Sequence, residues 1–181
     1  TALWGRLFRG WGDFLKVAFG CNLDYLKGML RLIDQELLRW KADTRRKPLL
    51  LKGARQVGKS WSVGELGRTF EEAVTVDLER DRSLHRVFEG DLDANRLVRE
   101  LRILKSASLV AGKSLLFIDE IQACPRAIMA LRYLYEQLPE LHVVAAGSLL
   151  EFALADISFP VGRGSFLEMH PMTFAEFLWA V

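Results

Sequence analysis

Short apolar runs alternate with longer segments of mixed polarity over most of this chain. Four of these runs have the length and composition of buried strands, and they span residues 49–51, 73–78, 114–118 and 141–146. The longer segments between them place apolar residues every three or four positions, which is typical of helices with one buried face. Strands that alternate with helices form a mostly parallel sheet with helices on both faces. The pattern therefore predicts an α/β fold with three layers.

Signals at the segment ends indicate where the helices lie. One or two surface helices are expected within residues 81–108, and Pro125 suits the first turn of another helix. Residues 148–151 and 173–176 both have the spacing of a capping box, so a helix is expected to begin at each of them. The remaining predictions are a helix over residues 61–70 and a last strand over residues 165–169.

The first 40 residues differ from the rest of the chain. Their apolar spacing predicts an N-terminal helical segment over residues 1–40, which packs against the main domain, residues 41–181, or against a partner. Basic residues on the aromatic-rich first helix leave a membrane surface as the alternative. The chain starts without methionine and stops at Val181 within an apolar segment. We therefore expect it to be part of a longer protein.

Composition narrows the classes of function without choosing one. The 181 residues carry 25 basic and 23 acidic side chains, which gives a net charge of +2. This charge is too small to favour nucleic-acid binding by the protein as a whole, and it does not exclude a local basic patch. The two cysteines and three histidines lack metal-ligand spacing, and a zinc site is not expected. The low cysteine content favours a cytoplasmic location. No apolar run approaches the roughly 18 residues of a membrane span.

A glycine-rich stretch directly after the first apolar run carries the strongest chemical signal. It fits G-x-x-x-x-G-K-[ST], the phosphate-binding P-loop or Walker A motif, and consists of Gly53, Ala54, Arg55, Gln56, Val57, Gly58, Lys59 and Ser60. The backbone N–H groups of such a loop and the N-terminus of the following helix bind phosphates. Lys59 is expected to reach the β- and γ-phosphates, and Ser60 is expected to ligate Mg²⁺.

A second set of candidates follows the later strands. Asp119 and Glu120 come directly after the third apolar run in the form of a Walker B motif: the aspartate serves Mg²⁺, and the glutamate accepts a proton from the attacking water. Ser148 either senses the γ-phosphate or only caps a helix, and Gln122 is a further candidate for positioning water. Arg163 either neutralises transition-state charge, in its own chain or toward a neighbour, or is an exposed loop arginine.

Five segments in this order resemble the hallmarks of a prokaryotic AAA-like P-loop ATPase family. They are residues 51–60, 117–125, 145–151, 160–163 and 172–178. The resemblance implies the strand order 5-1-4-3-2, in which the strand 141–146 lies between the P-loop strand and the Walker B strand. It also implies an ATP-binding core that is followed by a C-terminal domain of poorly defined function, before which this chain stops.

The motifs leave more than one function open. A GTPase would need an N-K-x-D guanine signature, which the chain lacks, so ATP is the expected nucleotide. The first hypothesis is an Mg²⁺-dependent ATPase. The second is a nucleotide-dependent switch with slow or no turnover, in which ATP exposes a surface for a protein partner. A DNA-associated motor is a weaker third hypothesis, and the sequence specifies neither the partner nor the oligomeric state.

Overall fold

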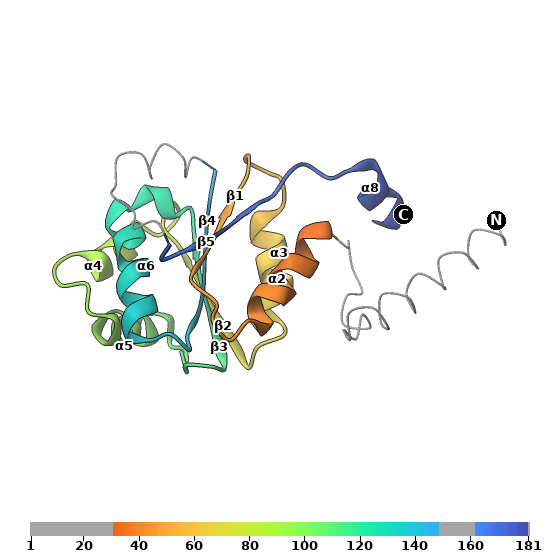
Figure 1. Ribbon diagram of the computed structural model, residues 1–181. Coiled ribbons are helices and arrows are strands. Elements are labelled where there is room, and N and C mark those ends of the chain that lie inside the picture. Colours follow the sequence, from red (N-terminus) through yellow and green to blue (C-terminus); the bar gives the residue numbers. More distant parts are fainter. Residues whose placement is uncertain (1–30, 149–161, 181) are drawn as a thin grey trace. The chain divides into compact units, whose positions relative to one another are not determined.

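The computed structural model describes residues 31–148 and 162–180 (Figure 1). The chain separates into two compact units, and residues 31–173 form one of them. This unit contains the whole described sheet, whereas the last helix, α8 (Phe174–Ala180), belongs to the other unit. The helices predicted within residues 1–30 and directly after Ser148 lie outside the described residues, and the predicted domain division at residues 40 and 41 stays a prediction.

Five parallel strands form one sheet in the order β2-β3-β4-β1-β5. The strands are β1 (Leu49–Lys52), β2 (Glu72–Asp77), β3 (Ser114–Asp119), β4 (His142–Gly147) and β5 (Ser165–Glu168). Taken from the opposite edge, this order is 5-1-4-3-2, so the predicted topology is confirmed. The predicted strand limits agree with the observed ones to within one residue at each end.

Helices cover both faces of the sheet, as Figure 1 shows. The helices α2 and α3 lie against one face, and α4, α5 and α6 lie against the other. Their bounds are α2 (Leu32–Ala42), α3 (Lys59–Gly67), α4 (His85–Phe88), α5 (Ala94–Lys105) and α6 (Pro125–Gln137). The prediction of a three-layer α/β fold is therefore confirmed.

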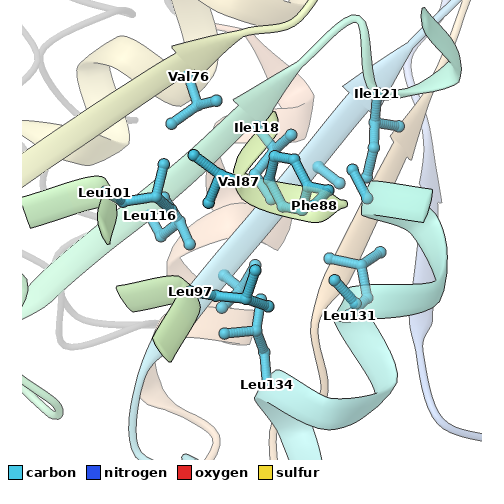
Figure 2. Close-up of a cluster of buried hydrophobic side chains, with 14 of the residues drawn as sticks. Val76, Val87, Phe88, Leu97, Leu101, Leu116, Ile118, Ile121, Leu131 and Leu134 are labelled. Atoms are coloured by element: carbon cyan, nitrogen blue, oxygen red, sulfur yellow. The ribbon is translucent and has the colours of Figure 1, made fainter. Parts of the chain in front are cut away.

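Alternation along the strands divides the hydrophobic core into two clusters. In β1, Leu49 and Leu51 belong to the cluster under α2 and α3, whereas Leu50 belongs to the cluster under α5 and α6. Figure 2 shows the second cluster, in which side chains of both helices meet β3 through Leu97, Leu101, Leu116, Ile118, Leu131 and Leu134. Burial of each such leucine stabilises the fold by about 1.5–3 kcal/mol. The two clusters together hold β1 and β3, and therefore the loops that follow them, in place.

Local chemistry explains where α5 begins and ends and where α6 begins, the two longest helices among the described residues. The side chain of Asp93 accepts a hydrogen bond from the backbone N–H of Arg96 at 2.9 Å, which caps the N-terminus of α5. The helix ends at Lys105, and the C-cap residue Ser106 has a left-handed backbone with φ 49°. Pro125 occupies the first turn of α6, as predicted. The predicted surface helices of residues 81–108 correspond to a short 3₁₀ turn, Arg82–Leu84, followed by α4 and α5.

A histidine at the beginning of β4 is buried between aromatic rings. His142 is 5% exposed, and its ring makes edge contacts with Trp40 and Phe70 at centroid distances of 5.9 and 4.7 Å. Burial, followed by the positive charge of Arg46, lowers the pKa of His142 from 6.5 to about 4. The imidazole is therefore neutral in the folded protein at physiological pH.

We expect His142 to make the fold sensitive to acid. As the pH falls below 6.5, the unfolded chain binds a proton at this histidine before the folded chain does, so the free energy of unfolding decreases until about pH 4. The full effect is on the order of 3 kcal/mol. The H142F variant keeps an aromatic ring and lacks this proton. Urea denaturation of both proteins between pH 7.5 and 4 should show the parent losing stability relative to H142F. A constant difference in the free energy of unfolding over this range would contradict the lowered pKa of His142.

Candidate functional site

The loop between β1 and α3 has a backbone that favours glycine at two positions. Gly53 has φ 151°, and a Cβ atom there would lie 2.3 Å from the carbonyl oxygen of Met169. Gly58 has φ 97° and forms the N-cap of α3 in a left-handed conformation. Between them, Gln56 also has a positive φ of 64°. These conformations curl the chain between the end of β1 and the first turn of α3, as a phosphate-binding loop requires.

Lys59 is the first residue of α3, directly after this loop. Its side chain is 5% exposed, and its Nζ donates hydrogen bonds to the carbonyl oxygens of Gly53 and Ala54, both at 2.8 Å. Burial lowers the pKa of Lys59, and the negative charges of Glu120 and Asp119 oppose this shift. The ammonium group has three protons, and these two bonds use two of them. The lysine is thus held by the loop backbone, close enough to Asp119 at the end of β3 and to Glu120 after it for both charges to affect its pKa.

The first turn of α3 meets the end of β3 through one short hydrogen bond. The hydroxyl of Ser60 donates to Oδ2 of Asp119 at 2.6 Å. Asp119 is 8% exposed, and burial raises the pKa of its carboxyl group, while the Ser60 hydrogen bond lowers it. The backbone oxygen of Asp119 also accepts a hydrogen bond from the N–H of Leu78 at 3.1 Å, which fixes the end of β3 beside the end of β2.

These two side chains fit a magnesium ion that is shared with phosphates. A hydroxyl and a carboxylate are hard oxygen donors, and Mg²⁺ commonly binds one or two protein oxygens together with phosphate oxygens and water. Within the described parts of the chain, no cluster of three or more histidine, cysteine, aspartate or glutamate side chains could hold a metal by itself. The donor set of Ser60 and Asp119 therefore suits a metal that arrives with a phosphate ligand.

Glu120 has a strained backbone and a partner for its carboxylate. Its φ and ψ are 48° and 46°, a left-handed conformation that is unfavourable for a residue with a side chain. The amide Nε2 of Gln122 donates a hydrogen bond to Oε2 of Glu120. The backbone N–H of Glu120 donates to Oδ1 of Asp119 at 3.0 Å. The two neighbouring carboxylates therefore have different side-chain partners: Asp119 accepts from Ser60, and Glu120 accepts from Gln122.

Ser148 lies directly after β4, the strand between β1 and β3. In the register of the sheet, Gly147 is opposite Lys52, the last residue before the loop. The hydroxyl oxygen of Ser148 is buried and has no hydrogen-bond partner among the described residues. This position is compatible with the predicted phosphate contact. The alternative, a capping box with Glu151, involves a residue outside the described ones.

The structure does not bring Arg163 to the loop. Arg163 precedes β5, and the N–H of Ser165 donates to the carbonyl oxygen of Pro48 at 2.9 Å, so this segment lies at the amino edge of the sheet. The loop and Asp119 lie at the opposite, carboxyl edge. The guanidinium of Arg163 forms an ion pair with Glu136 near the end of α6. The predicted role toward phosphate in the same chain therefore has no support here, and a role toward a neighbouring chain stays a prediction.

Comparison with known proteins identifies the family. Residues 45–178 match the model of a family described as an AAA domain. The chain belongs to this family. The matched range begins after α2 and includes the glycine loop, Asp119 and Glu120. No curated protein matches the chain. Among the described helices of this AAA domain, none is long and apolar enough to cross a membrane.

The AAA domain has an open cleft beside the loop that the sequence did not indicate. Residues that follow β2 and β3 line it together with one residue of the loop; they are Arg55, Glu79, Arg82, His85, Gln122 and Ala123. Arg55 and Glu79 are exposed and form an ion pair at 3.6 Å. A ring nitrogen of His85, Nε2, lies 2.7 Å from the carbonyl oxygen of Leu78. Arg82 and His85 follow the carboxyl end of β2, and ligands of parallel sheets bind at this edge. This position is the sequence signal that could have indicated both residues as part of a cleft.

The backbone of Glu120 generates a stability prediction. The variants E120G and E120A both remove the carboxylate, but only glycine adopts the left-handed conformation without steric cost. We expect E120G to be more stable than E120A by about 1 kcal/mol. Urea denaturation measures the difference, and the pair controls for the lost contact with Gln122. An E120A protein as stable as E120G would contradict the strain at this position.

Proposed function

We propose that this AAA domain binds ATP together with Mg²⁺ and hydrolyses it. The observation that carries the proposal is the convergence of Lys59, Ser60, Asp119 and Glu120 at the carboxyl edge of the sheet. In open α/β sheets, ligands bind at this edge. Membership of the AAA domain family supports nucleotide binding in general, and the absence of an N-K-x-D signature favours ATP over GTP.

The loop and Lys59 would hold the phosphates. Backbone N–H groups between Gly53 and Ser60 are the donors, and the N-terminus of α3 adds partial positive charge. Lys59 keeps one proton for a phosphate oxygen while it bonds the carbonyl groups of Gly53 and Ala54. Its low exposure strengthens the attraction to phosphate, because water screens a buried charge less. These contacts would hold the triphosphate at the carboxyl edge of the sheet, next to the end of β3.

Ser60 and Asp119 would hold Mg²⁺. The ion, when bound, neutralises charge on the phosphate oxygens during the displacement. The hydroxyl and the carboxylate are already 2.6 Å apart, so both can face one ion, directly or through water. A divalent cation also favours the ionised form of Asp119 and thereby opposes the effect of burial on its pKa.

Glu120 would act as the general base. Its carboxylate accepts a proton from the water that attacks the γ-phosphate. The amide of Gln122 bonds one oxygen of this carboxylate and leaves the other for the water. Ser148 is a second candidate contact to the γ-phosphate, because its hydroxyl is buried without a partner among the described residues.

Two substitutions separate phosphate binding from hydrolysis. We expect E120Q to bind ATP with parent affinity and to lose turnover by about 10²–10⁴-fold, because the amide cannot accept the proton. We expect K59A to bind ATP about 10–100-fold more weakly, because a charged hydrogen bond is lost. Fluorescence titration with an ATP analogue measures binding, and phosphate release measures turnover.

The matched controls are K113A and E140Q, which change the same residue types next to the amino ends of β3 and β4. Both controls should bind and hydrolyse ATP as the parent does. Equal turnover in E120Q and the parent would exclude Glu120 as the base. Parent affinity in K59A would exclude the proposed phosphate contact.

A nucleotide-dependent switch with slow turnover is the second candidate function. The hydrogen bond from Gln122 is compatible with slow turnover, since it occupies one oxygen of the Glu120 carboxylate and leaves only the other for a water. In that case ATP would order the site and expose a surface for a protein partner or a C-terminal domain. A high steady-state rate of the isolated protein would count against the switch. Stimulation by DNA would instead support a DNA-associated role.

A further inference from the structure

A buried arginine contacts the glycine loop from outside the range that matches the AAA domain family. Arg31 is 5% exposed and directly precedes α2. Its Nη1 donates a hydrogen bond to the carbonyl oxygen of Val57 at 2.7 Å, and its Nη2 donates to the carbonyl oxygen of His170 at 2.8 Å. The guanidinium thus joins the loop to the segment that follows β5. Neither contact has a role in the hydrolysis proposed above.

The bond to Val57 determines the direction of the next amide. In a trans peptide, the C=O and the following N–H point in opposite directions. The described residues contain no cis peptide, so the N–H of Gly58 points away from Arg31 when the oxygen of Val57 points toward it. Gly58 is also where the loop passes close to this arginine, because a Cβ atom there would lie 3.3 Å from Nη1.

The arginine is itself held in place. Its backbone N–H donates to Oδ2 of Asp34 at 2.9 Å, and the N–H of Asp34 donates to the oxygen of Arg31 at 3.0 Å, which caps α2. Leu37 of this helix is buried in the core under α2 and α3. On the other side, the N–H of Met169 donates to the oxygen of Lys52 at 2.8 Å, so the chain before His170 is fixed to the end of β1.

We propose that Arg31 is a positioning residue for phosphate binding. It turns the peptide between Val57 and Gly58 so that the N–H of Gly58 faces the phosphate groups of a nucleoside triphosphate. Burial of a guanidinium costs free energy, and its hydrogen bonds to rigid backbone oxygens offset that cost. This inference rests on the proposed function, in which the loop binds ATP. It adds a residue of the N-terminal region to the determinants of affinity.

The test compares R31M and R31K with the matched control L37A. R31M keeps an apolar stem and loses both donors, so the Kd for Mg·ATP should rise about 10–100-fold. R31K can bond one carbonyl oxygen at a time and should weaken binding less. L37A destabilises the same helix and leaves Arg31 in place, so its folded fraction should bind with parent affinity. Titrations are made at a temperature at which circular dichroism shows every variant to be folded.

A second readout does not depend on ATP. In ¹H–¹⁵N spectra, the amide signal of Gly58 should move in R31M and R31K and keep its position in L37A. Parent Kd in a folded R31M, or the same loss of affinity in R31M and L37A, would overturn the inference. If R31M does not fold, the same comparison is made with R31K: parent Kd in folded R31K, or the same loss of affinity in R31K and L37A, would overturn the inference. A parent protein that binds no ATP would overturn the proposed function, and the Gly58 signal would still decide whether Arg31 orients this peptide.

Discussion

The parallel register of β1, β4 and β3 is the constraint on which the candidate site depends. It brings the end of β1 and the end of β3 to the same edge of the sheet, with only β4 between them. The glycine loop follows β1 directly, Asp119 is the last residue of β3, and the hydrogen bond from Ser60 to Asp119 connects the two. The two core clusters stabilise this register, because each strand buries side chains on both faces.

Several groups at this edge oppose the stability of the fold. Lys59 and Asp119 are buried charged residues, Glu120 has a left-handed backbone, and the hydroxyl of Ser148 has no partner among the described residues. Each feature costs free energy in the folded state unless a ligand or a neighbour compensates it. Their accumulation at one edge is typical of a functional site, because selection there favours chemistry over stability.

The sequence predicted those features of the fold and of the site that depend on the local pattern of residues. Apolar runs identified four of the five strands, β1 to β4, and the spacing of Gly53, Gly58 and Lys59 identified the loop between β1 and α3. For Arg163 the sequence left a catalytic role and an exposed loop position open, because a motif does not tell at which edge of the sheet its loop lies. Arg31 was not found at all. Its partner His170 is 139 residues away, and such a contact leaves no trace in local spacing.

The central claim is that the loop, Lys59, Ser60 and Asp119 form one site for ATP and Mg²⁺. Isothermal titration of the unaltered protein with ATP, first with Mg²⁺ and then with EDTA, tests it most directly. The account predicts saturable binding at one site per chain in Mg²⁺ and clearly weaker binding in EDTA, because Ser60 and Asp119 then lack the ion that links them to the phosphates. Absence of saturable heat in Mg²⁺, or equal affinity in both buffers, would contradict it.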